Sequence, residues 1–356
     1  MAVARKGLNV TVLWVNVKKG SGLLTRQLSN YEESGLRVMQ LDITSAFWKF
    51  IYTLYPILKR LVIRTVYPDL KNQEYDVIHS NVIHPAAVIG DSLSKKMELP
   101  HIISEHFSKV NYLSNHLVFG KTLRRIYNEA HFILPVSDYL GHVIEGVSKN
   151  TKIEIVPNII DRGDDYYFGD IENTTEVSPI RFVAVAHWHK TKRMVKRPDL
   201  IIQALGELKQ EGKLTDFSIE FIGGGNQVNS LQKLTSQFGL SVHFSGNQNS
   251  NYIGKTLRNS TFFLHASTVE TFSVVTAEAL ACGLPVIASK VGAIPELINK
   301  ENGVLVDNTI ESWKKGILHA VNTNYDKRKI SENTDNRFDY TIVGDQLLNI
   351  YNRALP

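Results

Sequence analysis

The chain has 356 residues and a formal net charge of +5, and 43% of its residues are hydrophobic. This composition is typical of a globular protein of about two domains, and it excludes a disordered chain, a fibre and a coiled-coil rod. A single cysteine, Cys282, excludes a disulfide framework and multi-cysteine metal sites, and it favours a reducing, cytoplasmic setting. No apolar run reaches the ~18 residues that span a bilayer, and Met1–Gly7 contains no apolar signal-peptide core.

The positive charge belongs to the first half of the chain. Residues 1–160 carry 19 Lys and Arg against 13 Asp and Glu, a net charge of +6, whereas residues 161–356 carry 21 against 22, a net charge of −1. A basic half suits nucleic acid, an acidic membrane surface or phosphorylated substrates. Nucleic acid is the poorest of these explanations, because no nucleic-acid recognition motif accompanies the basic residues.

Short β-rich runs alternate with helical patterns in both halves. The strands predicted in the first half, each followed by a predicted helix, are Asn9–Val17, Leu36–Asp42, Asp76–Ser80, His101–Ser104 and His131–Val136. Those predicted in the second half are Ile180–Val185, Ser218–Ile222, Ser241–Phe244, Thr261–His265 and Pro285–Ala288. This alternation predicts an α/β fold with two Rossmann-like domains built on parallel sheets.

The acidic, aperiodic stretch that ends at Pro179 predicts the connection between the two domains. We expect an N-terminal domain over residues 1–161, a linker over 162–179 and a C-terminal domain over 180–338. Residues 339–356 have a helical apolar pattern, and we expect this helix to cross back to the N-terminal domain.

An aromatic, apolar stretch with four cationic side chains, residues 46–67, admits two interpretations. It is either a helix packed on the first sheet or an interfacial element in contact with an anionic membrane, at the inner face of the cytoplasmic membrane.

The segment Phe262–Leu297 reads as strand, loop, helix, tight turn and strand. Glu270 lies in the loop and Glu278 lies eight positions later, one to two turns into the helix. The free backbone N–H groups at the start of this helix suit a phosphate or diphosphate. Glu278 is placed to accept hydrogen bonds from a ribose diol.

This segment resembles the signature of glycosyltransferase family 4, a Glu-x7-Glu pair followed by an EA-x-A-x-G-x-PV pattern, here within AEALACGLPV. Weaker matches are IVPNIID (155–161), FIGGGN (221–226), NGVLVD (302–307) and the DVIHSN, IHPAA and SEH segments between Asp76 and His106. The resemblance implies two Rossmann-like domains facing a cleft (GT-B). It also implies a nucleotide-sugar donor held by the C-terminal domain and an acceptor held by the N-terminal domain.

The resemblance assigns roles residue by residue. Glu270 and His106 are the implied catalytic residues beside the reacting sugar. The implied donor-binding residues are Lys196, Glu278, Thr271, Phe272, Ser273, Gly223 and Gly224. His187 stands where the family has an Arg, so Lys192 or Arg193 is expected to supply the second cation for the diphosphate. His84 and Asn81 are expected on the acceptor side. His84 and His106 also have purely structural interpretations, as does the glycine run.

No metal ion or other cofactor is expected, because fixed cations and helix amides stabilise a departing diphosphate, and no histidine spacing of the HExxH type occurs. The family normally opens with a strand, a glycine loop and a long helix. This chain opens at AVARKGLNVTVL, so the first strand of its first sheet is expected to be missing between the strands at Asn9 and Asp76.

The predicted function is a retaining glycosyltransferase that acts on a glycan or lipid-linked acceptor, in cell-surface polysaccharide biosynthesis (lipopolysaccharide or capsule). The alternatives are another GT-B enzyme, namely a sugar-nucleotide epimerase or a phosphorylase, and a non-catalytic nucleotide-binding subunit or fragment.

Overall fold

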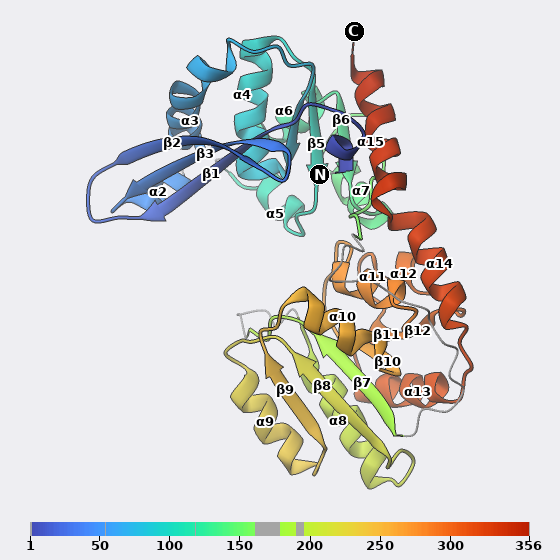
Figure 1. Ribbon diagram of the computed structural model, residues 1–356. Helices are drawn as coiled ribbons and strands as arrows, with labels where there is room; N and C mark the ends of the chain where they lie inside the picture. The colour runs from blue at the N-terminus through green and yellow to red at the C-terminus, as the bar shows by residue number, and fades with distance from the viewer. Residues whose placement is uncertain (1, 54, 118, 161–178, 190–195, 356) are drawn as a thin grey trace. The chain divides into compact units, whose positions relative to one another are not determined.

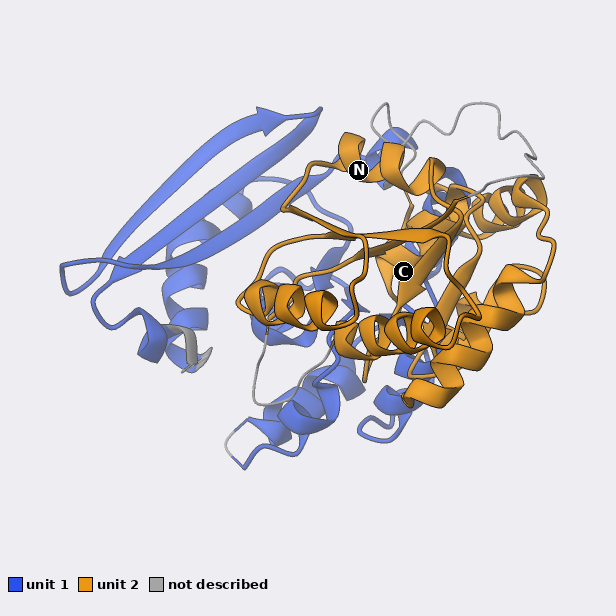
Figure 2. Ribbon diagram, turned by 90° about the horizontal axis from the view of Figure 1, so that it is seen from below, with its two compact units in different colours: residues 1–157, 341–356 blue, residues 158–340 orange. Residues whose placement is uncertain are grey.

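The computed structural model describes residues 2–53, 55–117, 119–160, 179–189 and 196–355 (Figure 1). The chain forms two compact units (Figure 2). Unit 1 comprises residues 1–157 and 341–356, and unit 2 comprises residues 158–340. The sequence therefore enters unit 1, passes through unit 2 and returns to unit 1. Almost all of the predicted linker, 162–179, lies outside the described residues.

Unit 1 begins with helix α1 (Ala2–Arg5) and a three-stranded sheet in the order β1-β3-β2. Strands β1 (Thr11–Lys19) and β3 (Leu36–Ser45) are parallel, and β2 (Thr25–Glu33) is antiparallel to β3. The helix predicted between the first two strands is therefore wrong, because β2 occupies that stretch. Most side chains of β2 are exposed, as an edge strand allows, so it lacks the apolar run that predicts a strand.

Helices cover one face of this sheet. They are α2 (Trp48–Thr53), α3 (Tyr55–Leu70) and α4 (Val88–Met97). Alternate side chains of β3 are buried, as a half-covered strand requires, and they share a core with α3 and α4. Its buried members include Met39, Leu41, Ile43, Leu58, Val62, Val66 and Leu93.

The second sheet of unit 1 is parallel, in the order β4-β5-β6. Its strands are β4 (Ile78–Asn81), β5 (His101–Glu105) and β6 (Phe132–Pro135). The elements around it are the π-helical turn η1 (Ile83–Ala87), α5 (Val110–Ser114), α6 (Gly120–Glu129) and α7 (Asp138–Glu145). From the sequence we expect β1 and β4 to flank a missing strand of a single sheet. In the structure β1 and β4 belong to two different sheets.

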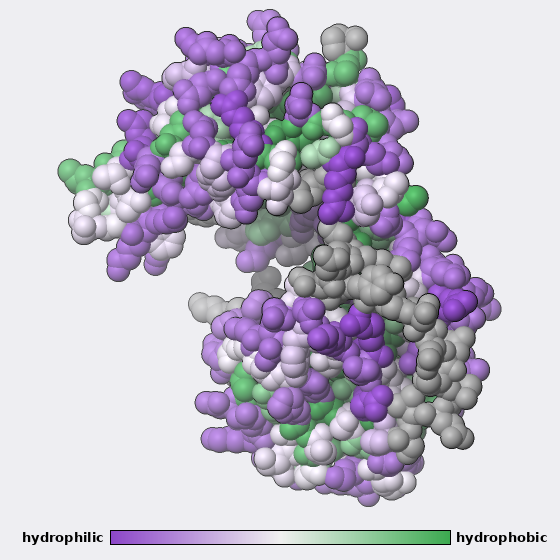
Figure 3. All heavy atoms as spheres, viewed as in Figure 1, coloured by the Kyte–Doolittle hydropathy of each residue, from purple (hydrophilic) through white to green (hydrophobic). Residues whose placement is uncertain are grey.

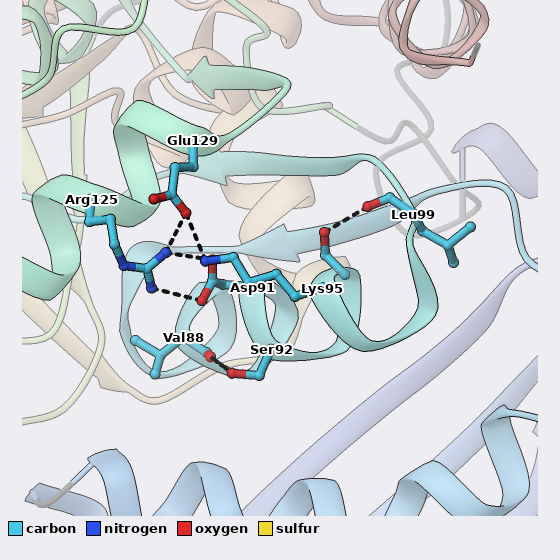
Figure 4. A network of polar contacts seen from close by, with 8 residues as sticks. Val88, Asp91, Ser92, Lys95, Leu99, Arg125 and Glu129 are labelled. Atoms are coloured by element: carbon cyan, nitrogen blue, oxygen red, sulfur yellow. Dashed lines mark hydrogen bonds and ion pairs between the residues drawn. The ribbon is translucent and has the colours of Figure 1, made fainter.

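A network of charged side chains ties α4 to α6 (Figure 4). The largely buried carboxylate of Asp91 accepts hydrogen bonds from both Nη atoms of Arg125, at 3.2 and 2.9 Å. Lys95 lies 3.1 Å from Asp91 and 2.7 Å from Glu129, and Arg125 also contacts Glu129. The bidentate geometry fixes the two helices against each other more firmly than a single exposed ion pair would.

Helix α15 (Tyr340–Ala354) packs within unit 1 through polar contacts along its length. Gln346 donates to the carbonyl of Ile155 at 2.6 Å, and Arg353 donates to Glu154 at 2.9 Å. Near the start of the helix, Asp345 accepts from Lys6 at 2.6 Å.

Unit 2 is one six-stranded parallel sheet in the order β12-β11-β10-β7-β8-β9. The strands are β7 (Ile180–Val185), β8 (Phe217–Ile222), β9 (Val242–Gly246), β10 (Phe262–His265), β11 (Val286–Ser289) and β12 (Gly303–Val306). The α/β fold class is confirmed. Strand β12 was predicted only as a family segment and not as a strand, since four residues give little periodicity.

Helices flank the sheet of unit 2. They are α8 (Pro198–Gln210), α9 (Val228–Gln237), α10 (Ser250–Arg258), α11 (Val274–Ala281), α12 (Ile294–Leu297), α13 (Ile310–Val321) and α14 (Lys327–Phe338). The core on one face joins Trp313 of α13 to the apolar side of α8 and to Phe221 of β8. None of the helices in the described ranges is long and apolar enough to cross a membrane.

Candidate active site

Strands β7 and β10 are parallel neighbours in the sheet of unit 2, and the order in which strands are added to the sheet reverses between them: β8 and β9 follow on one side of β7, and β11 and β12 follow on the far side of β10. In open α/β sheets the loops at the carboxyl ends of two such strands diverge and leave room for a ligand. Three described loops leave neighbouring strands on this edge: residues 186–189 after β7, 223–225 after β8 and 266–273 after β10. Lys196 lies beside the third loop through an antiparallel bridge to Ser267.

Lys196, Glu270 and His265 form a charged cluster on this edge. The Lys196 ammonium contacts Glu270 Oε1, and His265 Nε2 lies 2.9 Å from the same oxygen. Both Glu270 and His265 are largely buried. The structure thus brings together the predicted cation Lys196 and the predicted sugar-facing carboxylate Glu270, and it adds His265, which sequence reasoning missed.

The cluster keeps Glu270 ionised. Burial alone raises the pKa of Glu270, but the hydrogen bond from His265 and the charge of Lys196 outweigh it and lower the pKa to about 2. Burial lowers the pKa of His265, and Lys196 lowers it further, so the ring is neutral near pH 7. The neutral ring donates its Nε2 proton to Glu270, while Lys196 supplies the charge that balances the carboxylate.

A separate set of hydrogen bonds holds the loop that carries Glu270. The amide of Ser267 donates to Ser289 Oγ at 3.1 Å, Ser289 donates to Asn308 Oδ1 at 2.6 Å, and Asn308 donates back to the Ser267 carbonyl at 2.8 Å. On its other side the loop packs closely against Gly292. A Cβ at this position would lie 2.0 Å from the carbonyl oxygen of Glu270, so a larger residue would displace the loop. The loop therefore has one well-defined path, and Glu270 has a fixed position.

Helix α11 begins directly after this loop, at the position that the sequence predicts. Ser273 precedes the helix in a left-handed conformation, with φ of 77°. Its Oγ lies 2.8 Å from Thr276 Oγ1 and 3.3 Å from His265 Nε2. The amides of Thr276 and Ala277 donate to the carbonyl of Ser273 at 3.2 Å. The N–H groups that lack a helical acceptor by geometry are therefore those of Val274 and Val275, next to the Glu270 loop, where they suit an anion.

The other predicted residues of this segment occupy different environments. Thr271 and Glu278 are half-buried, and Glu278 lies on the second turn of α11. Phe272 is buried, and its ring packs edge-on against Phe338 with the centroids 5.3 Å apart. The side chain of Phe272 thus anchors the loop, which leaves only its backbone for a ligand.

The glycine loop after β8 lies against the loop after β7. Gly223 has φ of +115°, and a Cβ there would lie 1.9 Å from the carbonyl oxygen of Ala186. The amide of Gly224 donates to Asn247 Oδ1 at 2.7 Å, and its carbonyl accepts from the amide of Trp188 at 2.9 Å. Only glycine permits this approach, so Gly223 and Gly224 form a constrained backbone surface rather than a loose turn.

His187 lies in the loop after β7, next to the glycine loop, and its side chain is exposed. Lys192 and Arg193, the predicted substitutes for the family's Arg, lie outside the described residues.

The residues predicted on the acceptor side lie at the carboxyl edge of the second sheet of unit 1. Asn81 ends β4 and is followed by Val82, whose φ of 66° is strained for a β-branched residue. His84 follows in η1, where burial lowers its pKa. His106 follows β5, the parallel neighbour of β4.

Glu105, which sequence reasoning also missed, joins the two loops that carry His84 and His106. Its buried carboxylate accepts from the amide of Ile83 at 2.8 Å, from those of His106 and Phe107 at 3.0 and 2.9 Å, and from the Tyr127 hydroxyl at 2.7 Å. Burial raises the pKa of Glu105, and the four donors lower it in part. In the SEH segment, the glutamate therefore positions the histidine.

Among the described residues, no group of three or more His, Cys, Asp or Glu side chains is arranged to hold a metal ion.

Known proteins resemble this chain over almost all of its length. The sequence model of "Glycosyltransferase Family 4" matches residues 2–163, and that of "Glycosyl transferases group 1" matches residues 189–337. An uncharacterized glycosyltransferase of Methanocaldococcus jannaschii is 26% identical over 74% of this chain and 70% of its own length. The GDP-mannose-dependent alpha-(1-6)-phosphatidylinositol monomannoside mannosyltransferase of Mycolicibacterium smegmatis is 26% identical over 63% of this chain and 61% of its own length.

Solved structures show the same fold. Sucrose-phosphate synthase from Thermosynechococcus elongatus has a TM-score of 0.72 and 16% identity, covering 99% of this chain and 90% of that one. Anabaena HepE in complex with UDP has a TM-score of 0.67 and 18% identity, covering 89% and 86%. These structures show the GT-B fold, and the two sequence models show that the chain belongs to glycosyltransferase family 4, whose members are nucleotide-sugar-dependent transferases.

Proposed function

We propose that the enzyme transfers a sugar, with retention of anomeric configuration, from a nucleoside diphosphate sugar to a hydroxyl group of a glycan or lipid-linked acceptor. The observation that carries the proposal is the cluster of Lys196, Glu270 and the start of α11, at the point where the strand order of unit 2 reverses between β7 and β10. It presents a cation, a carboxylate and free helix amides to one ligand.

Each part suits a step of sugar transfer. When the sugar–phosphate bond breaks, the departing nucleoside diphosphate gains negative charge, which Lys196 and the α11 amides stabilise from fixed positions. Glu270 stays ionised over the whole range near neutrality and accepts hydrogen bonds from sugar hydroxyls. Glu278 on the second turn of α11 accepts from the ribose diol, and the glycine loop brings its backbone close to the nucleotide.

The proposal needs neither a metal ion nor another cofactor, since the cations and amides of the chain supply the charge stabilisation. We assign the acceptor to unit 1, with His106 as its catalytic residue and His84 and Asn81 as its acceptor-side residues. The basic character of residues 1–160 suits an acceptor at an anionic surface, so we place the enzyme in the cytoplasm at the inner membrane face, with peripheral contact through residues 46–67. The setting that fits best is cell-surface polysaccharide biosynthesis.

Calorimetric titration of UDP, GDP and ADP tests the donor site directly. We expect one of them to bind, and Glu278→Ala to weaken that binding about 10- to 100-fold, because a hydrogen bond to a charged group is worth about 1.5–3 kcal/mol. Glu332→Ala removes an exposed glutamate from α14 and is the matched control. An unchanged affinity in Glu278→Ala would show that the ribose lies elsewhere.

A turnover assay then separates the alternatives. A transferase releases nucleoside diphosphate in proportion to added acceptor, and we expect this release to persist with a chelator present. An epimerase or phosphorylase needs no such acceptor, and a non-catalytic subunit binds nucleotide without release.

A further inference from the structure

Three arginines of unit 1 line one hollow. Arg26 is the second residue of β2, and Arg60 and Arg64 lie one turn apart on α3. They line a hollow of about 740 Å³ together with Pro56, Ile57 and Leu61. We call this hollow the arginine groove.

The charge of the arginine groove is not balanced by the surrounding protein. Arg26 Nη1 donates to Thr65 Oγ1 at 3.1 Å, which orients its guanidinium along α3. Within the described ranges, no carboxylate forms an ion pair with any of the three arginines. Three guanidinium groups without a counter-charge attract phosphate groups. Each guanidinium can donate two parallel hydrogen bonds to the oxygens of one phosphate, a bidentate contact.

Exposed apolar side chains stand beside the groove. Leu23 is 80% exposed, Phe47 59% and Phe50 58%, and Leu24 is 40% exposed. We call these four residues the apolar tip. Figure 3 shows hydrophobic side chains at the outer end of this sheet, where Figure 1 places the loop between β1 and β2.

Hydrogen bonds hold the two segments of the apolar tip together. The amide of Ala46 donates to the carbonyl of Gly22 at 2.8 Å, and Ser45 Oγ contacts the carbonyl of Leu23 while accepting from the amide of Phe47 at 3.0 Å. The hydrogen bonds therefore order the apolar tip in a conformation that exposes large apolar side chains to solvent. An exposed apolar patch of this kind marks an interaction surface.

The tip and the groove are adjacent in the structure. Arg26 follows Leu24 by two positions and pairs with Ile43 of β3, two residues before Ser45. Apolar side chains next to clustered arginines match the boundary of a bilayer, where acyl chains lie below a layer of lipid phosphates. A soluble phosphorylated ligand would use the arginines but would leave the tip without a partner.

We propose that unit 1 docks on an anionic bilayer, with the apolar tip inserted below the headgroups and a lipid phosphate held in the arginine groove by Arg26, Arg60 and Arg64. This inference deepens the proposed function and rests on it, since a transferase with a lipid-linked acceptor meets that acceptor at such a surface. It adds to residues 46–67 the loop between β1 and β2 and an arginine from β2, which the sequence pattern left out.

Flotation of the full chain with lipid vesicles tests the docking. We expect binding to vesicles of phosphatidylcholine mixed with phosphatidylglycerol and little binding to phosphatidylcholine alone. Each arginine near an anionic surface contributes about fivefold to the affinity, so R60A/R64A should lower it about 30-fold. Added salt should weaken the binding of the parent chain, since it screens the same charges.

Matched variants distinguish binding at this site from a general effect of positive charge or of exposed hydrophobic side chains. K71A/K121A removes the same charge from exposed positions of unit 1 outside the groove, and we expect it to bind as the parent does. L23S/F47S should bind poorly even though the groove is intact, whereas L117S, which changes a leucine that is 97% exposed elsewhere on unit 1, should not. R60K/R64K keeps the charge but loses the bidentate geometry, so its affinity for anionic vesicles should lie between those of the parent and R60A/R64A.

Several outcomes would overturn the proposal. One is equal binding to neutral and anionic vesicles, and another is an equal loss in K71A/K121A. A third is displacement of the protein from vesicles by inorganic phosphate at the concentration of the lipid phosphate, which would identify the groove as a site for a soluble anion. The nucleotide titration is independent of these measurements. A chain that binds UDP but not vesicles contradicts only the docking, and a chain that binds vesicles but no nucleotide contradicts only the donor site.

Discussion

Single buried polar residues set the chemistry on both edges described above. Glu105 and His265 each act through a neighbour: Glu105 holds the loops of His84 and His106, and His265 orients Glu270. The sequence did not predict either role, because a glutamate at the end of one strand and a histidine at the end of another carry no spacing signal. Their roles depend on burial and on partners that only the folded sheet brings near. Glu270 and Glu278 were candidates because of the Glu-x7-Glu spacing of the family signature, and Lys196 because it matches the family's lysine.

His79 on β4 shows how such burial controls stability. Its Nδ1 lies 2.6 Å from the hydroxyl of Tyr351 on α15, and its Nε2 lies 2.8 Å from Ser104 Oγ. Burial lowers the pKa of His79 to about 4, with smaller contributions from His101 and His106. The folded chain therefore keeps the ring neutral at pH values where the unfolded chain already binds a proton.

The resulting prediction concerns stability at low pH. The contribution of His79 is fully present above its unfolded pKa of about 6.5 and is lost as the pH falls toward 4, about 3 kcal/mol in all. We expect His79→Gln to reduce the slope of unfolding free energy against pH in this range by about 1.4 kcal/mol per unit. Urea unfolding at several pH values measures it. Tyr351→Phe should keep the slope, because burial is its main cause, and equal slopes for the parent and His79→Gln would refute this account.

At the scale of elements, strand ends were easier to predict than strand partners. The buried apolar run of β7 has the predicted bounds, Ile180–Val185. Strand β2 escaped prediction because its pairing with β3 comes from tertiary structure, and its own side chains are largely polar and exposed. The Ser34-Gly35 pair between them was the available signal, since both residues have positive φ, as a two-residue hairpin turn requires.

The contact between the loops after β7 and β8 gives a prediction at this scale. Gly223→Ala places a Cβ against the backbone of Ala186, so one loop must move. A strained backbone of this kind costs about 1–3 kcal/mol. If that cost falls on the nucleotide-binding conformation, affinity drops about 5- to 150-fold, which calorimetry measures. Gly212→Ala is the control, because Gly212 also has a positive φ, +68°, but open space around its Cβ position. An equal loss in both variants would point to general destabilisation.

At the scale of the whole molecule, the two units differ in how well the sequence predicts them. The one continuous sheet of unit 2 follows from alternating apolar strands and helices. Unit 1 contains two sheets, one of them mixed, and it recruits a helix from the far end of the sequence. The sequence predicted that residues 339–356 return to the N-terminal domain. Contacts so distant in sequence leave no local pattern, however, so the individual residues that α15 contacts are known only from the fold.

Helix α15 should contribute strongly to the stability of unit 1. Ile350 is buried on this helix, whereas Ile342 is half exposed. We expect Ile350→Asp to destabilise unit 1 by about 3–5 kcal/mol, because it buries an unpaired charge. Hydrogen exchange followed by mass spectrometry should show faster exchange in β4 and β6. Ile342→Asp should leave exchange as in the parent, and the same acceleration in both variants would contradict the assigned packing.

The return of the chain to unit 1 also bears on biosynthesis. When residues 1–157 have emerged from the ribosome, residues 341–356 have not yet been synthesised. Unit 1 therefore lacks α15 until unit 2 has been translated. Unit 2, although it begins later, is complete first. During that interval the surface that α15 will cover, including His79, stays open to solvent and to chaperones. The last stage of folding is then a docking step whose timing is set by translation rather than by local propensity.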